Sequence, residues 1–202
     1  MHSKPVCQYD VLRDCAILKN ELTFRNLYEL ICGHGDSEAA IWLEGDIIKS
    51  LSFNQLSALC DKCAAAFSKQ LGTSGRVCIS MDACKEWFPL FWGLVRSGHD
   101  VLTVDASMPD DKVAVLMKQA GTVYIVSSKA RKLGNGCVQI FLSDLADAPE
   151  AKNYVPVWGH DVALCPSGTT SESRVFVYDE AAICCHALFS EKVYRDNKNL
   201  ID

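Results

Sequence analysis

The sequence predicts an α/β fold in which a mainly parallel, mixed sheet has helices on both faces and a β-hairpin precedes it. Between residues 76 and 126, short apolar segments suited to strands alternate with longer segments suited to helices. The strand segments are apolar throughout, which is typical of parallel strands that are covered on both faces. A glycine follows each of the longer predicted helices and marks its end.

The N-terminal half begins with a helix from about Thr23, followed by a hairpin. Residues 40–43 and 47–51 read as its two strands, with a turn at 44–46. Ser52 and Gln55 then form a capping-box pattern, and apolar residues recur at helical spacing until Gly72. This pattern predicts one amphipathic helix of about five turns.

The remaining elements follow from apolar runs and their flanking residues. Helices are expected over 86–96, ending before Gly98, and from Pro109 to Gly121, and Asp179 is suited to cap a last helix. The expected strands are 77–80, 101–104, 122–126, 138–142, 161–165 and 175–178. Gly134-Asn135-Gly136 marks a turn before the fourth of these strands.

The composition is that of one ordinary globular domain spanning residues 1–202. A net charge of −5 and scattered lysines and arginines argue against a nucleic-acid partner. The strongest apolar stretch, 87–95, is much shorter than the roughly 20 residues of a membrane span, and the first residues lack the apolar core of a signal peptide. Eleven cysteines at irregular spacing indicate free thiols in a reducing compartment, so we expect a cytoplasmic protein.

The most informative segment is the loop Ser167-Gly168-Thr169-Thr170-Ser171-Glu172-Ser173-Arg174, which lies between two predicted strands. Backbone N–H groups around a glycine can converge on an anion, hydroxyls add donors, and arginine adds a cation. A loop at the end of a strand is also where open α/β sheets bind ligands. These features favour a phosphate site formed by Ser167, Gly168, Thr169, Thr170, Ser171 and Arg174, although a serine- and threonine-rich hairpin is the alternative from composition alone.

This loop resembles the signature of the acyl-adenylate-forming superfamily, which includes acyl-CoA synthetases, nonribosomal peptide adenylation domains and luciferases. The signature reads approximately [ST]-G-[ST]-T-[GS]-x-P-K, and residues 167–171 match it position by position. Ser173 stands where the family usually has proline, and Arg174 where it usually has lysine. Weaker agreement in order and spacing extends over about residues 22–190, whereas the Walker-type nucleotide loop is absent from the sequence.

The resemblance implies the N-terminal subdomain of an acetyl-CoA synthetase-like fold and a two-step reaction. A small carboxylic acid would attack Mg²⁺·ATP to give acyl-AMP and pyrophosphate, and a thiol such as coenzyme A or a phosphopantetheine carrier would then take the acyl group. The loop would hold the β- and γ-phosphates. No catalytic residue is expected in this segment, because the family's later motifs lie in a C-terminal part that would be a necessary partner. We therefore expect a fragment that is inactive alone; the alternative is a non-catalytic module for nucleotide binding or interaction.

Other candidate sites have simpler structural explanations. Cys60 and Cys63 lie on the apolar stripe of a helix, which favours core packing over metal or redox chemistry. The first turn of the helix after Pro109 carries Asp110 and Asp111, which suit its dipole better than a metal. Four aromatic residues are expected in the core but can form a patch for self-association; they are Trp87, Phe88, Phe91 and Trp92.

Overall fold

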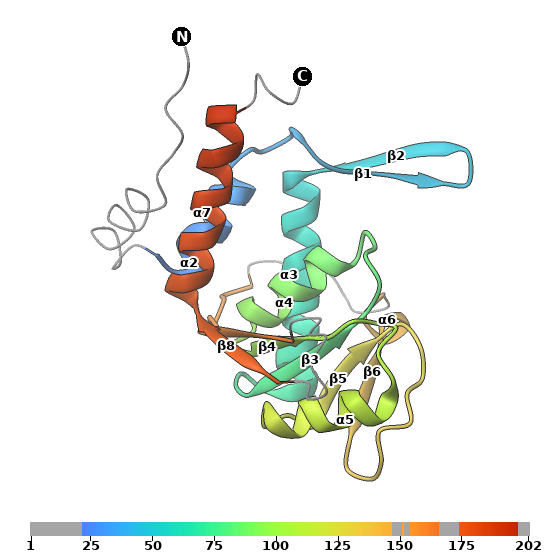
Figure 1. Ribbon diagram of the computed structural model, residues 1–202. Coiled ribbons are helices and arrows are strands. Elements are labelled where there is room, and N and C mark those ends of the chain that lie inside the picture. The colour runs from blue at the N-terminus through green and yellow to red at the C-terminus, as the bar shows by residue number, and fades with distance from the viewer. Residues whose placement is uncertain (1–21, 147–150, 152–153, 166–173, 198–202) are drawn as a thin grey trace.

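The computed structural model describes residues 22–146, 151, 154–165 and 174–197. Two sheets are present in these residues, a two-stranded hairpin and a six-stranded sheet with the order β6-β5-β3-β4-β7-β8 (Figure 1). The strands are β1 Glu38–Glu44, β2 Ile47–Ser52, β3 Arg76–Ser80, β4 Asp100–Thr103, β5 Tyr124–Ser127, β6 Val138–Phe141, β7 Asp161–Leu164 and β8 Phe176–Asp179. The helices are α2 Phe24–Cys32, α3 Phe53–Leu71, α4 Trp87–Arg96, α5 Asp110–Gln119, α6 Leu142–Ala146 and α7 Glu180–Asn197.

Side chains at the helix starts explain where these helices begin. The Thr23 side chain accepts a hydrogen bond from the Asn26 amide, and Ser52 and Gln55 form the reciprocal bonds of a capping box before α3. Asp179 accepts from the Ala182 amide at 2.8 Å at the start of α7. The three starts predicted from sequence are thus confirmed, because each depends on contacts within one turn.

The direction in which the chain connects successive strands reverses at the centre of the large sheet. β3, in the middle, pairs in parallel with β4 on one side and with β5 on the other. The chain therefore leaves β3 toward one edge of the sheet and later returns past it toward the other. In open α/β sheets, ligands bind outside the carboxyl ends of the strands at such a switch point.

Two hydrophobic clusters lie on opposite faces of the sheet. One cluster includes Val77 and Ile79 of β3 and packs under α2, α3, α4 and α7. The other includes Cys78 and packs under α5. Figure 1 shows α3 and α4 on one side of the sheet and α5 on the other, which confirms the fold class predicted from sequence.

The end of the sheet is antiparallel. β8 pairs with β7 in the register Leu164↔Phe176 to Asp161↔Asp179. The segment between the two strands therefore leaves and re-enters the sheet at the carboxyl end of β7. All four residues of β8 are exposed.

The predicted core assignments are largely confirmed. Trp92 and Cys60 are 4% and 0% exposed, and Cys63 is half-buried, so burial raises the pKa of both thiols, that of Cys63 to about 11. Trp87 stacks on Phe91 with a centroid distance of 5.4 Å, and both pack against the core. The large exposed apolar side chains of the described region instead include those of the hairpin and β8.

Candidate functional site

The carboxyl ends of the parallel strands bring several polar segments to one edge of the sheet. Residues 104–109 follow β4, residues 128–132 follow β5, and Cys165 follows β7. Because β4 pairs directly with β7, with Thr103 opposite Leu164, the segment 104–109 is the immediate neighbour of the chain that leaves β7. This edge is the candidate site.

The predicted phosphate loop begins and ends at this edge. Ser167, Gly168, Thr169, Thr170 and Ser171 lie outside the described residues, so the structure tests neither their geometry nor their role. Cys165 and Val175, which flank the loop, are half-buried and pack in the cluster under α5. Arg174 is described and exposed at the end of the loop.

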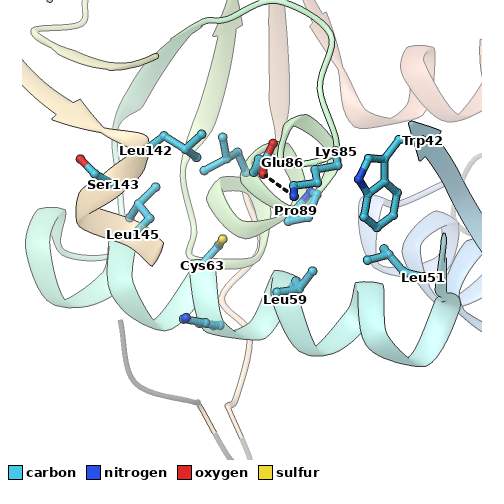
Figure 2. A pocket seen from close by; sticks show the side chains of 12 residues that line it. Trp42, Leu51, Leu59, Cys63, Lys85, Glu86, Pro89, Leu142, Ser143 and Leu145 are labelled. Carbon is cyan, nitrogen blue, oxygen red and sulfur yellow. Dashed lines mark ion pairs between the residues drawn. The ribbon is translucent and has the colours of Figure 1, made fainter. Parts of the chain in front are cut away.

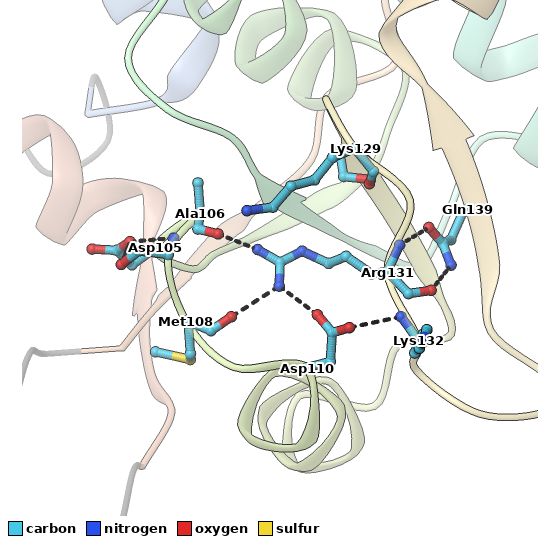
Figure 3. Close-up of polar contacts among 10 residues, drawn as sticks. Asp105, Ala106, Met108, Asp110, Lys129, Arg131, Lys132 and Gln139 are labelled. Atoms are coloured by element: carbon cyan, nitrogen blue, oxygen red, sulfur yellow. Dashed lines mark hydrogen bonds and ion pairs between the residues drawn. The ribbon is translucent and has the colours of Figure 1, made fainter.

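A buried arginine is the centre of the described part of the site (Figure 3). The Arg131 side chain is only 1% exposed. Its Nη1 donates to the Met108 carbonyl oxygen and to Asp110 Oδ1, both at 2.9 Å, and its Nη2 donates to the Ala106 carbonyl oxygen at 2.6 Å. Gln139 holds the Arg131 backbone by accepting from its N–H at 2.9 Å and donating to its carbonyl oxygen.

Two carboxylates stabilise the same segment from within. Asp105 Oδ1 accepts from the hydroxyl and the amide of Ser107, and the pKa of Asp105 is lowered chiefly by the hydroxyl bond. Asp110 accepts from the Lys132 amide at 2.8 Å, and this bond, followed by the Arg131 guanidinium, lowers the pKa of Asp110. Both groups are therefore ionised at neutral pH. They fix the loop between β4 and α5 in one conformation.

Lysine and arginine give this edge of the sheet positive charge. Figure 3 shows the Lys129 side chain extending from the end of β5 toward Asp105 and Ala106. The Ser127 hydroxyl donates to the Lys129 carbonyl oxygen at 2.8 Å and fixes the start of this segment. Lys129 and Arg174 are both exposed, so an anion at this edge can reach them.

The opposite, amino-terminal edge of the sheet has its own arginine. Arg76 donates through Nη1 to the Ala120 carbonyl oxygen at 2.9 Å and pairs through Nη2 with Asp161. Asp100 lies 3.9 Å from the same nitrogen and accepts from the amides of His160 and Asp161. These contacts join the amino ends of the strands and lie away from the candidate site.

A separate apolar pocket lies between the hairpin, α3, α4 and α6 (Figure 2). Its volume is about 600 Å³. Lys85 at its rim lies 5.3 Å from the centroid of the Trp42 ring and 3.8 Å from Glu86. The other lining residues are Leu51, Leu59, Lys62, Cys63, Pro89, Leu90, Leu142, Ser143 and Leu145, so no segment after β4, β5 or β7 contributes to it.

Residues 28–177 match the family model described as AMP-binding enzyme. The chain belongs to this family. The match spans the parallel sheet and the predicted phosphate loop, so the resemblance inferred from the loop is confirmed for the family as a whole.

The relatives of the chain are longer proteins. A plipastatin synthase polypeptide from Bacillus subtilis (strain 168) is 22% identical over 172 residues, which cover 82% of this chain and 7% of that protein. The N-terminal subdomain of Klebsiella oxytoca NpsA, solved in complex with 3-hydroxybenzoyl-AMSN, superposes with a TM-score of 0.67 at 16% identity over 78% of this chain and 41% of that chain. The nonribosomal peptide synthetase FmoA3, solved in its AMPPNP-bound form, superposes with a TM-score of 0.64 at 19% identity. The match covers 81% of this chain and 18% of that chain.

These likenesses show that the chain has the fold of an adenylation N-terminal subdomain. The chain spans less than half of the length of each of these relatives. In the part that the structure describes, no helix has both the length and the apolar character needed to span a membrane. Within the same residues, no group of three or more His, Cys, Asp or Glu side chains is arranged to hold a metal ion.

Sequence reasoning missed Arg131. No helix or strand is predicted for residues 127–133, and an arginine in such a stretch is ordinarily exposed. One signal was available, since Arg131 lies four residues after the end of β5, where side chains reach the carboxyl edge. Its burial depends on Gln139 of β6 and on the segment after β4, which only the folded chain brings together.

Proposed function

We propose that this chain supplies the ATP phosphate-binding part of an enzyme that activates a carboxylic acid as an acyl-adenylate. The carboxylate oxygen would attack the α-phosphorus of ATP, the bond from that phosphorus to the oxygen bridging to the β-phosphorus would break, and pyrophosphate would leave. A thiolate of coenzyme A or of a carrier phosphopantetheine would then attack the acyl carbon and release AMP.

Family membership is the observation that carries this proposal. It is supported by the antiparallel pairing of β7 with β8, which brings Cys165 and Arg174, on either side of residues 166–173, to the carboxyl end of the parallel strands, where α/β sheets bind ligands. It is also consistent with relatives whose structures were solved with AMSN compounds or AMPPNP. The proposal leaves the acid open among fatty, aromatic and amino acids.

The loop's role in this proposal is electrostatic. The hydroxyls of Ser167, Thr169, Thr170 and Ser171 would donate to the β- and γ-phosphates, and Gly168 would allow the backbone to approach. Each hydrogen bond to a charged phosphate contributes about 1.5 to 3 kcal/mol. Arg174 would add a cation, and its planar fork would bind two phosphate oxygens where lysine would offer a point charge.

Magnesium enters the proposal with the nucleotide. Mg²⁺ is usually bound through substrate phosphates together with one or two carboxylates. The described edge offers Asp105 and Asp110, but both carboxylates are used in holding the segment after β4. We therefore assign Mg²⁺ to the triphosphate, without a dedicated protein cage in this region.

The test is acid-dependent exchange between pyrophosphate and ATP, measured with the intact protein that contains these residues. A panel of fatty, aromatic and amino acids is offered in turn, with labelled pyrophosphate and MgATP. We expect label in ATP with one acid class only, and the matching acyl-AMP by mass spectrometry. Nucleotide binding without exchange for every acid would instead indicate a non-catalytic nucleotide-binding module.

A further inference from the structure

The Arg131 guanidinium is a buried cation that donates to backbone carbonyl oxygens as well as to a carboxylate. Its guanidinium is almost completely buried but faces one carboxylate, Asp110, and two backbone carbonyl oxygens, those of Ala106 and Met108. Removing such a charge from water is expensive, and well-packed apolar residues often replace buried ion pairs without loss of stability. The arginine fixes the backbone at residues 106 and 108 by donating hydrogen bonds to their carbonyl oxygens, which an apolar residue cannot do.

The segment held in this way packs in the same hydrophobic cluster as the two residues that flank the predicted phosphate loop. Val104 and Met108 belong to the same hydrophobic cluster as Cys165 and Val175, the residues that flank the loop. In addition, Thr103 pairs with Leu164, so the chain leaves β4 and β7 side by side. A shift of Met108 would therefore alter the cluster against which Cys165 and Val175 also pack.

We propose that Arg131 is a positioning residue for the phosphate loop, acting through Met108 and the segment that joins β4 to α5. The inference rests on the proposed function, because it assumes that residues 167–174 bind ATP phosphates. Arg131 does not touch the nucleotide in this account. It fixes the backbone of the segment after β4, which shares a hydrophobic cluster with Cys165 and Val175, so that the residues flanking the loop are held in place before ATP arrives.

The chain contains a matched control. Arg76 is also largely buried and also joins a carbonyl oxygen to carboxylates, but at the amino-terminal edge of the same sheet. Arg131→Met and Arg76→Met thus remove similar interactions at opposite ends of the strands. A purely structural role would give both variants the same phenotype.

The experiment measures the melting temperature and the apparent KM for MgATP in pyrophosphate exchange, with the intact protein and a saturating acid. We expect Arg131→Met to raise this KM about tenfold, the equivalent of roughly 1.4 kcal/mol of coupling. Arg131→Lys keeps a cation that can still reach one or two of the oxygens, so it should give an intermediate KM. Arg76→Met should lower the melting temperature but leave the KM within about twofold of the wild type. A similar KM change in both methionine variants, or none in Arg131→Met, overturns the inference.

A second measurement separates this inference from the proposed function. Cys165 is half-buried and flanks the loop, whereas Cys84 is exposed and lies in the segment after β3. Iodoacetamide labelling followed by mass spectrometry should show faster modification of Cys165 in Arg131→Met, with Cys84 unchanged. If the wild-type protein exchanges no acid, the proposed function fails, and this labelling still decides whether Arg131 positions the loop. If Arg131→Met does not fold, Arg131→Lys is used for both measurements, and wild-type values in both overturn the inference.

Discussion

At the scale of single residues, a buried histidine makes the stability of the fold depend on pH. His99 is 1% exposed, and its Nδ1 lies 2.8 Å from the Ser97 hydroxyl, which itself donates to the Leu94 carbonyl oxygen. Nδ1 must therefore carry the hydrogen, and Nε2 has no hydrogen-bond partner among the described residues. Protonation would place a second N–H in this buried position. Burial accordingly lowers the pKa of His99, although Asp100 partly opposes the effect.

Because the pKa of His99 is lowered in the folded chain, we predict that the free energy of unfolding decreases as the pH falls. Because the pKa of His99 in the folded chain lies below the ordinary value of 6.5, the unfolded chain binds more protons below that pH. The contribution of His99 to the free energy of unfolding is complete above the ordinary pKa of 6.5. It decreases as the pH falls from there toward the lowered pKa of the folded chain. The free energy of unfolding, measured in urea from about pH 8 to about pH 5, should fall less steeply in His99→Gln than in the wild type. His160→Gln, which alters an exposed histidine, should keep the wild-type slope, and equal slopes in all three proteins would contradict the assignment.

At the scale of elements, close contact between α3 and α4 holds the helical layer on one face of the sheet. A Cβ added to Gly93 would lie 2.5 Å from Cys63 Cβ and 3.2 Å from the Ala64 nitrogen. Arg96 of α4 extends this contact by pairing with Asp61 of α3, and it stacks on the ring of Tyr28 of α2 at 4.2 Å. The position of α4 thus depends on the absence of a side chain at residue 93.

We expect Gly93→Ala to destabilise the protein by about 1 to 3 kcal/mol, the usual range for overpacking. Cys63→Gly alone should cost about 1 kcal/mol, because glycine is unfavourable within a helix. The double variant should be more stable than the sum of the two effects indicates, since Cys63→Gly removes the atom that the new methyl group meets. Urea unfolding of the four proteins gives this coupling, and strict additivity would show that the two helices do not meet at these residues.

The elements themselves were largely predictable, because their signals are local. Ser52 with Gln55, Asp179 and the glycines at 72, 98 and 121 mark boundaries that the structure confirms. Two details differ. β5 begins at Tyr124 instead of residue 122, since the Thr122 hydroxyl donates to the Arg76 carbonyl oxygen and accepts from the Tyr124 amide. The short helix α6 was not predicted, because its five residues carry little periodicity.

The arrangement at the site could not be predicted in the same way. The order of strands in the sheet and the burial of Arg131 depend on contacts between residues far apart in the sequence, such as Arg131 with Ala106 and Gln139. The motif at 167–171 identified the family, but its geometry lies outside the described residues. The sequence thus located the candidate loop, and the structure added the surroundings that hold its ends.

At the scale of the whole molecule, the hairpin stands apart from the large sheet (Figure 1). Leu43 and Ile48 face each other across it and are 71% and 72% exposed, and Ile41 on the same face is 63% exposed. A two-stranded hairpin is marginally stable on its own, and an exposed apolar face with open edges favours association. The surface that promotes self-association is therefore expected here and not at the aromatic residues of α4.

We predict that the 202-residue polypeptide associates with itself as its concentration rises, and that the variant carrying Leu43→Lys and Ile48→Lys does so less. Sedimentation velocity across a wide concentration range measures the change. Val115→Lys alters an exposed apolar residue on α5 and should behave as the wild type does. A wild type that stays monomeric at every concentration would contradict the prediction.

The central claim is that the loop after β7 holds the phosphates of ATP, and its most direct test is the apparent KM for MgATP in acid-dependent pyrophosphate exchange. Thr169→Ala and Thr170→Ala are compared with Ser128→Ala, which removes an exposed hydroxyl from the neighbouring segment after β5. Each threonine variant should raise the KM by about tenfold or more, as expected for the loss of one hydrogen bond to a charged phosphate, and Ser128→Ala should leave it unchanged. Threonine variants with a wild-type KM and rate would show that the loop does not bind the nucleotide.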